Sequence, residues 1–105
     1  MVTFGSLFMM KRREYAISIV VNQKKITKLI IDPHFEEKHA ASITDDIIIE
    51  LVKTLDGQFI EPDDENLPFS YFSTDKIELN GKFYKLVWLL EDDQIYIGVV
   101  NAYRR

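Results

Sequence analysis

The run of residues 82–90 is apolar at both sets of alternating positions, and it constrains the fold more than any other part of the sequence. A strand with one face in water alternates apolar and polar side chains, whereas a strand covered on both faces is apolar throughout. One set of positions holds Phe83, Val87 and Leu89, and the other holds Tyr84, Leu86, Trp88 and Leu90. We therefore expect residues 82–90 to form a central strand of a sheet.

Turn signals on both sides of this run predict neighbouring antiparallel strands. Asn80-Gly81 separates it from residues 76–79, and Asn-Gly is a strong hairpin signal because both turn residues need positive φ. The acidic turn 91–93 separates it from a last strand over residues 94–103, and residues 69–72 provide one more short strand. The second half of the chain is therefore predicted to be a meander of three or four strands.

The first part of the chain predicts a hairpin followed by a short helix. Residues 15–21 alternate apolar side chains, and residues 25–31 repeat their richness in β-branched residues. Pro33 ends the second run because proline lacks the N–H that a sheet ladder needs. Its fixed φ also suits the first turn of a helix, which we expect over residues 34–40.

A second helix is predicted between residues 42 and 57. Ser42 or Thr44 provides the N-cap, and Gly57 is the expected stop. Its apolar residues recur at helical spacing and define one buried stripe, which consists of Ile43, Ile47, Ile48, Leu51, Val52 and Leu55.

The predicted order of elements is an N-terminal hairpin, one or two helices and then an antiparallel meander. This order is typical of an α+β fold whose helices pack on one face of the sheet. The 105 residues contain no linker or repeat, so one domain is expected over 1–105. Translation that started at Met10 would make residues 1–9 a dispensable extension.

Charge is distributed unevenly along the chain. The net charge of −4 counts against a generic nucleic-acid binder, whose surface is usually basic. Residues 41–65 hold eight acidic side chains and one basic side chain, so one segment carries most of the acidity. Within it, the proline-containing stretch 61–68 predicts an exposed loop.

The residue types present predict neither a metal site nor a cofactor. The chain has no Cys, which excludes disulfides and Cys-ligated zinc and is typical of a cytoplasmic protein. His34 and His39 would point about 140° apart on a helix, so they are not expected to share a metal. Residues 63–65 lack the alternating ligand spacing of a calcium loop. The apolar stretch 1–10 is too short to span a bilayer, so no membrane association is expected.

Tyr103, Arg104 and Arg105 directly follow the last predicted strand. Arg presents a planar fork of donors that matches phosphate oxygens, and Tyr offers a stacking face and a hydroxyl, so these residues suit RNA or another phosphate ester. The alternative is a solvated basic tail. Lys85 interrupts an apolar strand, so it lies at an edge, extends to solvent along its stem, or faces a site. Four aromatic residues are expected to be core residues, and the alternative is a platform on which RNA bases stack; they are Phe83, Tyr84, Trp88 and Tyr96.

From Ile31 onward, the order of features resembles the BrnT-type toxins of bacterial toxin-antitoxin systems and, more loosely, the RelE-like ribonuclease superfamily. The matching features, in chain order, are Asp32-Pro33, Lys38-His39 with Ser42, Leu55-Asp56-Gly57, the apolar strand 86–90, Ile95-Tyr96-Ile97 and Ala102-Tyr103-Arg104-Arg105.

The resemblance implies a small α+β protein that cleaves RNA without a metal and is neutralised by a partner antitoxin. By position, Lys38, His39, Tyr103 and Arg104 are the catalytic candidates, and Arg105 and Lys85 are expected to bind the RNA. His39 would act as general base on the RNA 2′-hydroxyl, while the terminal arginines stabilise the charge of the transition state.

A non-catalytic interaction module is the alternative function. In that case, the acidic segment 45–65 binds a basic partner through charge complementarity, and the terminal arginines have no ligand. The sequence does not decide the oligomeric state.

Overall fold

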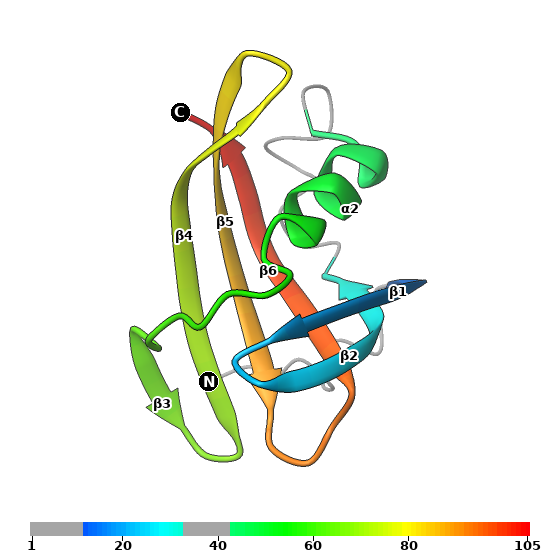
Figure 1. Ribbon diagram of the computed structural model, residues 1–105, viewed down its shortest axis with the longest axis vertical. Helices are drawn as coiled ribbons and strands as arrows, with labels where there is room; N and C mark the ends of the chain where they lie inside the picture. Colours follow the sequence, from blue (N-terminus) through cyan, green and yellow to red (C-terminus); the bar gives the residue numbers. More distant parts are fainter. Residues whose placement is uncertain (1–11, 33–42) are drawn as a thin grey trace.

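The computed structural model describes residues 12–32 and 43–105, and 60% of these residues lie in strands. The strands form one six-stranded mixed sheet. Figure 1 shows the helix α2 in front of it. The elements are β1 (Arg13–Val21), β2 (Lys24–Ile31), α2 (Asp45–Lys53), β3 (Asp64–Asn66), β4 (Phe69–Leu79), β5 (Lys82–Glu91) and β6 (Tyr96–Arg104). The strand order is β1-β2-β6-β5-β4-β3.

The predicted α+β fold class is wrong, because the described chain is mostly β and contains one helix. The sheet is also more than a hairpin and a meander, since β2 pairs in parallel with β6 from Lys28↔Tyr96 to Ile31↔Val99. Turn residues predict which two strands form a hairpin. They do not indicate which third strand pairs with the free edge of that hairpin. The predicted helix over 34–40 and the proposed extension 1–9 lie outside the described residues.

Two local predictions in the meander also differ from the structure. Residues 69–72 and 76–79 belong to one strand, β4, which is interrupted by a bulge between Thr74 and Ile77. Lys76 adopts a positive φ of 57° at this bulge. The predicted loop 61–68 contains the short edge strand β3, which pairs with the start of β4.

The prediction of a central strand over residues 82–90 is confirmed by β5, which lies between β4 and β6. Its even-numbered side chains from Tyr84 to Leu90 belong to a large core between the sheet and α2. In this core, Trp88 stacks on Phe72 with ring centroids 4.0 Å apart. The Trp88 indole donates a hydrogen bond of 3.0 Å to the Thr74 hydroxyl. We call this side of the sheet the helix face.

Helix α2 presents its predicted stripe to that core. Ile48, Leu51, Val52 and Leu55 are fully buried. Thr44 is the N-cap, because its side chain accepts a hydrogen bond of 3.3 Å from the Ile47 amide.

Strand β1 is attached to the start of α2 by a polar cluster. The Arg13 guanidinium donates to both carboxylate oxygens of Asp45, at 2.6 and 2.8 Å, and the Tyr15 hydroxyl also donates to Asp45. Desolvation alone would raise the pKa of Asp45, but the hydrogen bonds from Arg13 and Tyr15 lower it. The same contact raises the pKa of Tyr15, since a phenolate beside Asp45 would be unfavourable.

The turn between β1 and β2 is fastened to the segment that follows α2. Asn22, at a positive φ of 53°, donates to the Ile60 carbonyl at 2.9 Å and accepts from the Ile60 amide at 2.7 Å. The Gly57 amide donates to the Val20 carbonyl at 2.7 Å. The first hairpin is thus held against the end of α2 by backbone and side-chain hydrogen bonds.

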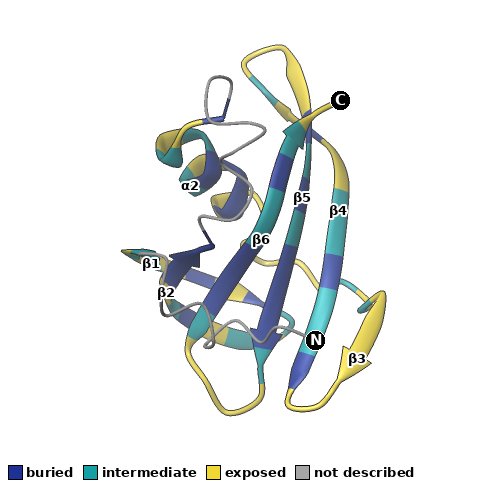
Figure 2. Cartoon of the chain, turned by 180° about the vertical axis from the view of Figure 1, so that it is seen from behind, coloured by how far each residue is buried: buried dark blue, intermediate teal, exposed yellow. Residues whose placement is uncertain are grey.

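The side of the sheet away from α2, which we call the opposite face, has a smaller apolar cluster. Its buried members are Ile30, Phe69 and Leu89, with Tyr71, Tyr96 and Val100 packed against them. Figure 2 shows exposure increasing toward the β4–β5 hairpin and the end of β6. Within residues 12–32 and 43–105, no helix has the length and apolar character of a membrane span.

Candidate functional site

Four of the six predicted site residues lie together where β6 ends beside β5. Tyr103 and Arg104 are the last two residues paired on β6, Arg105 follows them, and Lys85 lies on β5. Lys85 pairs with Tyr103, and the Arg105 amide donates to the Phe83 carbonyl at 2.8 Å. Lys38 and His39 lie outside the described residues, so the structure does not place them relative to this cluster.

The register of β5 and β6 assigns these residues to faces of the sheet. Tyr84 and Leu86 belong to the core of the helix face, so the intervening Lys85 lies on the opposite face. Tyr103 shares that face, because directly opposed residues point to the same side. Arg104 pairs with the buried Tyr84 and therefore lies on the other side from Tyr103. The two catalytic candidates of the last strand are thus divided between two faces.

Arg105 is held in place by Asp75 of β4. Its Nε and Nη2 atoms lie 2.9 and 3.1 Å from the two carboxylate oxygens, which is a bidentate contact. Desolvation alone would raise the pKa of Asp75, but hydrogen bonds from the Lys76 amide and the Arg105 guanidinium lower it. The ionised carboxylate orients a guanidinium that is still 47% exposed, and two bonds use only part of its five N–H donors.

A shallow pocket of about 440 Å³ adjoins this ion pair and is lined by Lys76, Phe83 and Arg105. Its volume falls within the range of small-molecule sites, which is roughly 300–1,000 Å³. Phe83 is 46% exposed, so its ring is accessible to a ligand. Two cations and an aromatic face suit a ligand that combines a planar ring with a negative charge.

The wider surroundings of the pocket are basic. We define the basic end of the sheet as the described residues around the β4–β5 turn and the end of β6; its cations are Lys76, Lys82, Lys85, Arg104 and Arg105. Asp75 and Glu78 are the carboxylates of the same region. A cationic surface of this kind attracts polyanions even on a protein of negative net charge.

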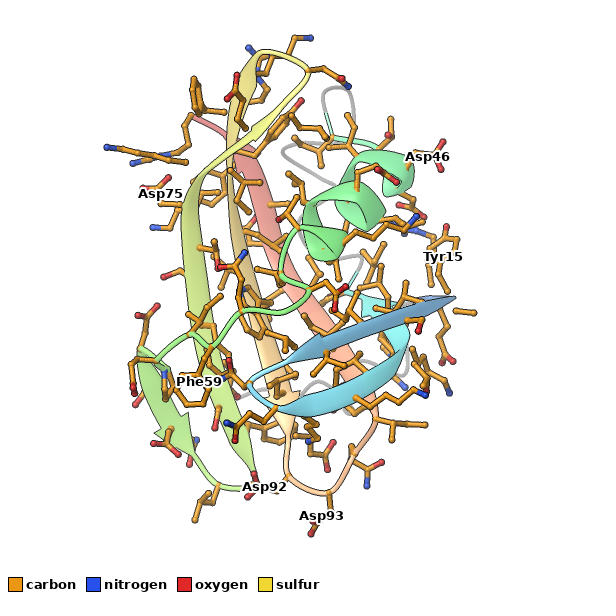
Figure 3. The ribbon with its side chains drawn as sticks, viewed as in Figure 1. Tyr15, Asp46, Phe59, Asp75, Asp92 and Asp93 are labelled. Atoms are coloured by element: carbon orange, nitrogen blue, oxygen red, sulfur yellow. The ribbon has the colours of Figure 1, made fainter. Side chains whose placement is uncertain are left out.

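The other end of the same strands is acidic. Figure 3 places Asp92 and Asp93 far from Asp75 along the length of the sheet, and Asp64 and Glu65 lie on the short edge strand beside the start of β4. The predicted acidic segment 45–65 is not one surface. Its first carboxylate, Asp45, is paired with Arg13 at the start of α2, whereas its last ones belong to β3.

Three residues of this site were not predicted as site residues. Phe83, Tyr84 and Trp88 were all expected in the core, and Tyr84 and Trp88 are buried there. Phe83 is exposed because it is the second residue of β5, next to the turn at the end of the sheet. Asp75 and Lys76 had one available signal. The buried apolar positions change from Phe72 to Ile77, an odd spacing that indicates an extra residue between them.

Metal ligands do not converge in the part of the chain that the structure describes, since no three His, Cys, Asp or Glu side chains there form a suitable group. Comparisons with protein-family models, curated proteins and solved structures give no match to this chain. The functional argument therefore rests on the side chains and geometry of the basic end.

Proposed function

We propose that this protein binds single-stranded RNA at the basic end of the sheet. The observation that carries the proposal is the in-register pair Lys85 and Tyr103, placed beside the pocket of Lys76, Phe83 and Arg105. Cations bind phosphates, and aromatic rings at a surface stack on bases that are not already stacked in a duplex. Phe83 is exposed and Tyr103 is half-buried. Both features are needed for single-stranded RNA, and both occur on one face of two adjacent strands.

Binding is tested by the affinity for a fluorescent twelve-nucleotide single-stranded RNA at low salt. We expect the double variant Lys85→Ala, Arg105→Ala to bind at least tenfold more weakly than the wild type. The matched control is Lys25→Ala, Lys53→Ala, which removes two exposed cations from β2 and α2 and should change the affinity less than twofold. Equal losses in the two double variants would refute a site at the basic end, since both remove the same charge.

We also propose that the bound RNA is cleaved without a metal through its 2′-hydroxyl, as the resemblance to BrnT-type and RelE-like toxins implies. Arg105 shares the face of Lys85 and Tyr103 and supplies positive charge that would stabilise a phosphorane-like transition state. Arg104 lies on the other face, so its part in cleavage is inferred from the sequence alone. The general base, His39, and its neighbour Lys38 are inferred from the sequence. In this proposal, an antitoxin protein is the partner that keeps the activity in check.

Cleavage is tested by incubating RNA with the wild type, His39→Ala and Arg104→Ala in the presence of EDTA. We expect 2′,3′-cyclic phosphate products from the wild type and at least a hundredfold lower rate from each variant. Equal rates in all three proteins would refute this mechanism while leaving the binding proposal intact. Growth arrest on expression, relieved by a co-expressed neighbouring gene, would support the toxin assignment.

A further inference from the structure

We propose that the basic end binds two consecutive nucleotides, one on each of two repeated units that pair an aromatic ring with a cation. The first unit is Phe83 with Arg105, and the second is Tyr103 with Lys85. This inference rests on the proposed binding of RNA and adds the length and register of the ligand that the site recognises.

The two units follow from the register of β5 and β6. Phe83 and Lys85 are two positions apart on β5, and Tyr103 and Arg105 are two positions apart at the end of β6. Residues two positions apart in a strand share a face. The pairing Lys85↔Tyr103 and the bond from the Arg105 amide to the Phe83 carbonyl then place the four side chains in a two-by-two array.

Ring and cation alternate within this array. Each row across the two strands holds one aromatic ring and one cation, and the order reverses between the rows. Rows are separated by two residues of a strand, which is about 7 Å. Within a row, opposed Cβ atoms lie about 5 Å apart. A base stacked on either ring therefore has a cation beside it for the adjoining phosphate.

Interactions with Asp75 are consistent with both cations of the array being on one side of the sheet. The Asp75 carboxylate binds the Arg105 guanidinium, and the nearby Lys85 charge contributes to lowering the pKa of that carboxyl. Arg105 also lines the pocket with Phe83. Asp75 thus interacts with one cation from each row. The pocket lies at the row of Phe83 and Arg105, which is the row nearer the end of the sheet.

The footprint of two nucleotides is tested with 5′-phosphorylated uridine oligonucleotides of one to six residues, whose affinities for the wild type are measured at one fixed low salt concentration. We expect the affinity to rise at least tenfold from one residue to two, and by less than twofold with each residue after that. A steady gain across all six lengths, or equal binding of one and two residues, would overturn the inference.

Single-ring variants test the assignment of the two units. Phe83→Ala and Tyr103→Ala should each bind the dinucleotide at least tenfold more weakly, yet bind the mononucleotide within about twofold of the wild type. Phe59→Ala removes a ring that is 64% exposed outside the basic end and should change neither affinity. Circular dichroism confirms that each variant is folded, and the length series on the wild type requires no variant.

The results separate this inference from the one on which it rests. If the twelve-nucleotide RNA does not bind the wild type, the proposed function fails. If that RNA binds but a ring variant loses the same factor for every oligonucleotide length, RNA binding stands and only the two-unit arrangement is refuted.

Discussion

On the helix face of β5, Trp88 and Leu86 are fully buried, whereas on the opposite face of the same strand Phe83 is 46% exposed. The helix face holds the large core, and every buried residue of α2 faces it. The opposite face holds a smaller apolar cluster and, at its basic end, the array of rings and cations. We infer that the helix face provides most of the stability of the fold. The opposite face can therefore carry exposed rings and cations at its basic end.

Two aromatic residues of one strand give the largest contrast between these faces. We expect Trp88→Ala to lower the free energy of unfolding by about 3–5 kcal/mol, because it removes a buried ring and leaves a cavity. Phe83→Ala should lower it by less than about 1 kcal/mol. Urea denaturation of the two variants measures both values, and similar losses would show that the faces do not differ in this way.

Adjacent residues of β4 provide a smaller contrast. Thr74→Val should cost about 2 kcal/mol, since it leaves the buried indole N–H of Trp88 without its hydrogen-bond acceptor. Ser73→Ala removes a hydroxyl that bonds the exposed Asp63, and it should cost less than about 0.5 kcal/mol. Thermal unfolding of both variants compares them directly, and Thr74→Val should cost less in a Trp88→Phe background, where no indole N–H is left unpaired.

The cluster at the start of α2 predicts a pH dependence. Asp45→Asn should cost about 1 kcal/mol at pH 7, because the side chains of Arg13 and Asp45 are both about three-quarters buried and their contact is bidentate. The pKa of Asp45 is lowered in the folded protein. Its contribution is therefore present above the ordinary value of 3.8 and is lost as the pH falls through the folded-state value.

This pH dependence is measured as the difference in unfolding free energy between the wild type and Asp45→Asn at several pH values. Taking the difference removes the titration of the other carboxylates. The difference should be constant from pH 7 to pH 5 and should shrink below pH 4. A difference that stays constant down to pH 2 would contradict the assigned role of Asp45.

The smallest expected change in stability belongs to the basic end. Lys85→Ala should change the free energy of unfolding by less than about 0.5 kcal/mol, since the side chain lies at the surface of the array. When the logarithm of the affinity for single-stranded RNA is plotted against the logarithm of the salt concentration, the same variant should have a slope that is smaller by about 0.7. This is the value for one phosphate contact with a single-stranded nucleic acid. An unchanged slope with weaker binding would show that Lys85 does not contact a phosphate.

Local features of the fold were predictable from the sequence because they depend on nearby residues. The Asn80-Gly81 turn has positive φ at both positions, and the buried stripe of α2 follows helical spacing. The fold class was not predictable, since the parallel pairing of β2 with β6 joins segments that are far apart in the chain. No turn residue or spacing indicates such a contact.

The candidate site was predictable only in part for the same reason. Residue types identified Tyr103, Arg104, Arg105 and Lys85, but the pairing of β5 with β6 decides which of them share a face. Phe83 belongs to the site because β5 starts there, where the side chains of the strand are no longer buried. Asp75 joins it through a bulge whose position is visible in the sequence only as a change in the phase of the buried residues.

The position of β6 has a consequence for the order in which the protein is made. This strand is translated after the other five, yet it lies between β2 and β5, so the first hairpin has no neighbour to pair with until β6 emerges from the ribosome. Contacts between such distant segments form late and slowly. The strand that completes the sheet also carries Tyr103 and ends next to Arg105. A chain cut short before this strand should therefore fail to assemble, rather than fold into a stable protein that lacks only the proposed RNA site.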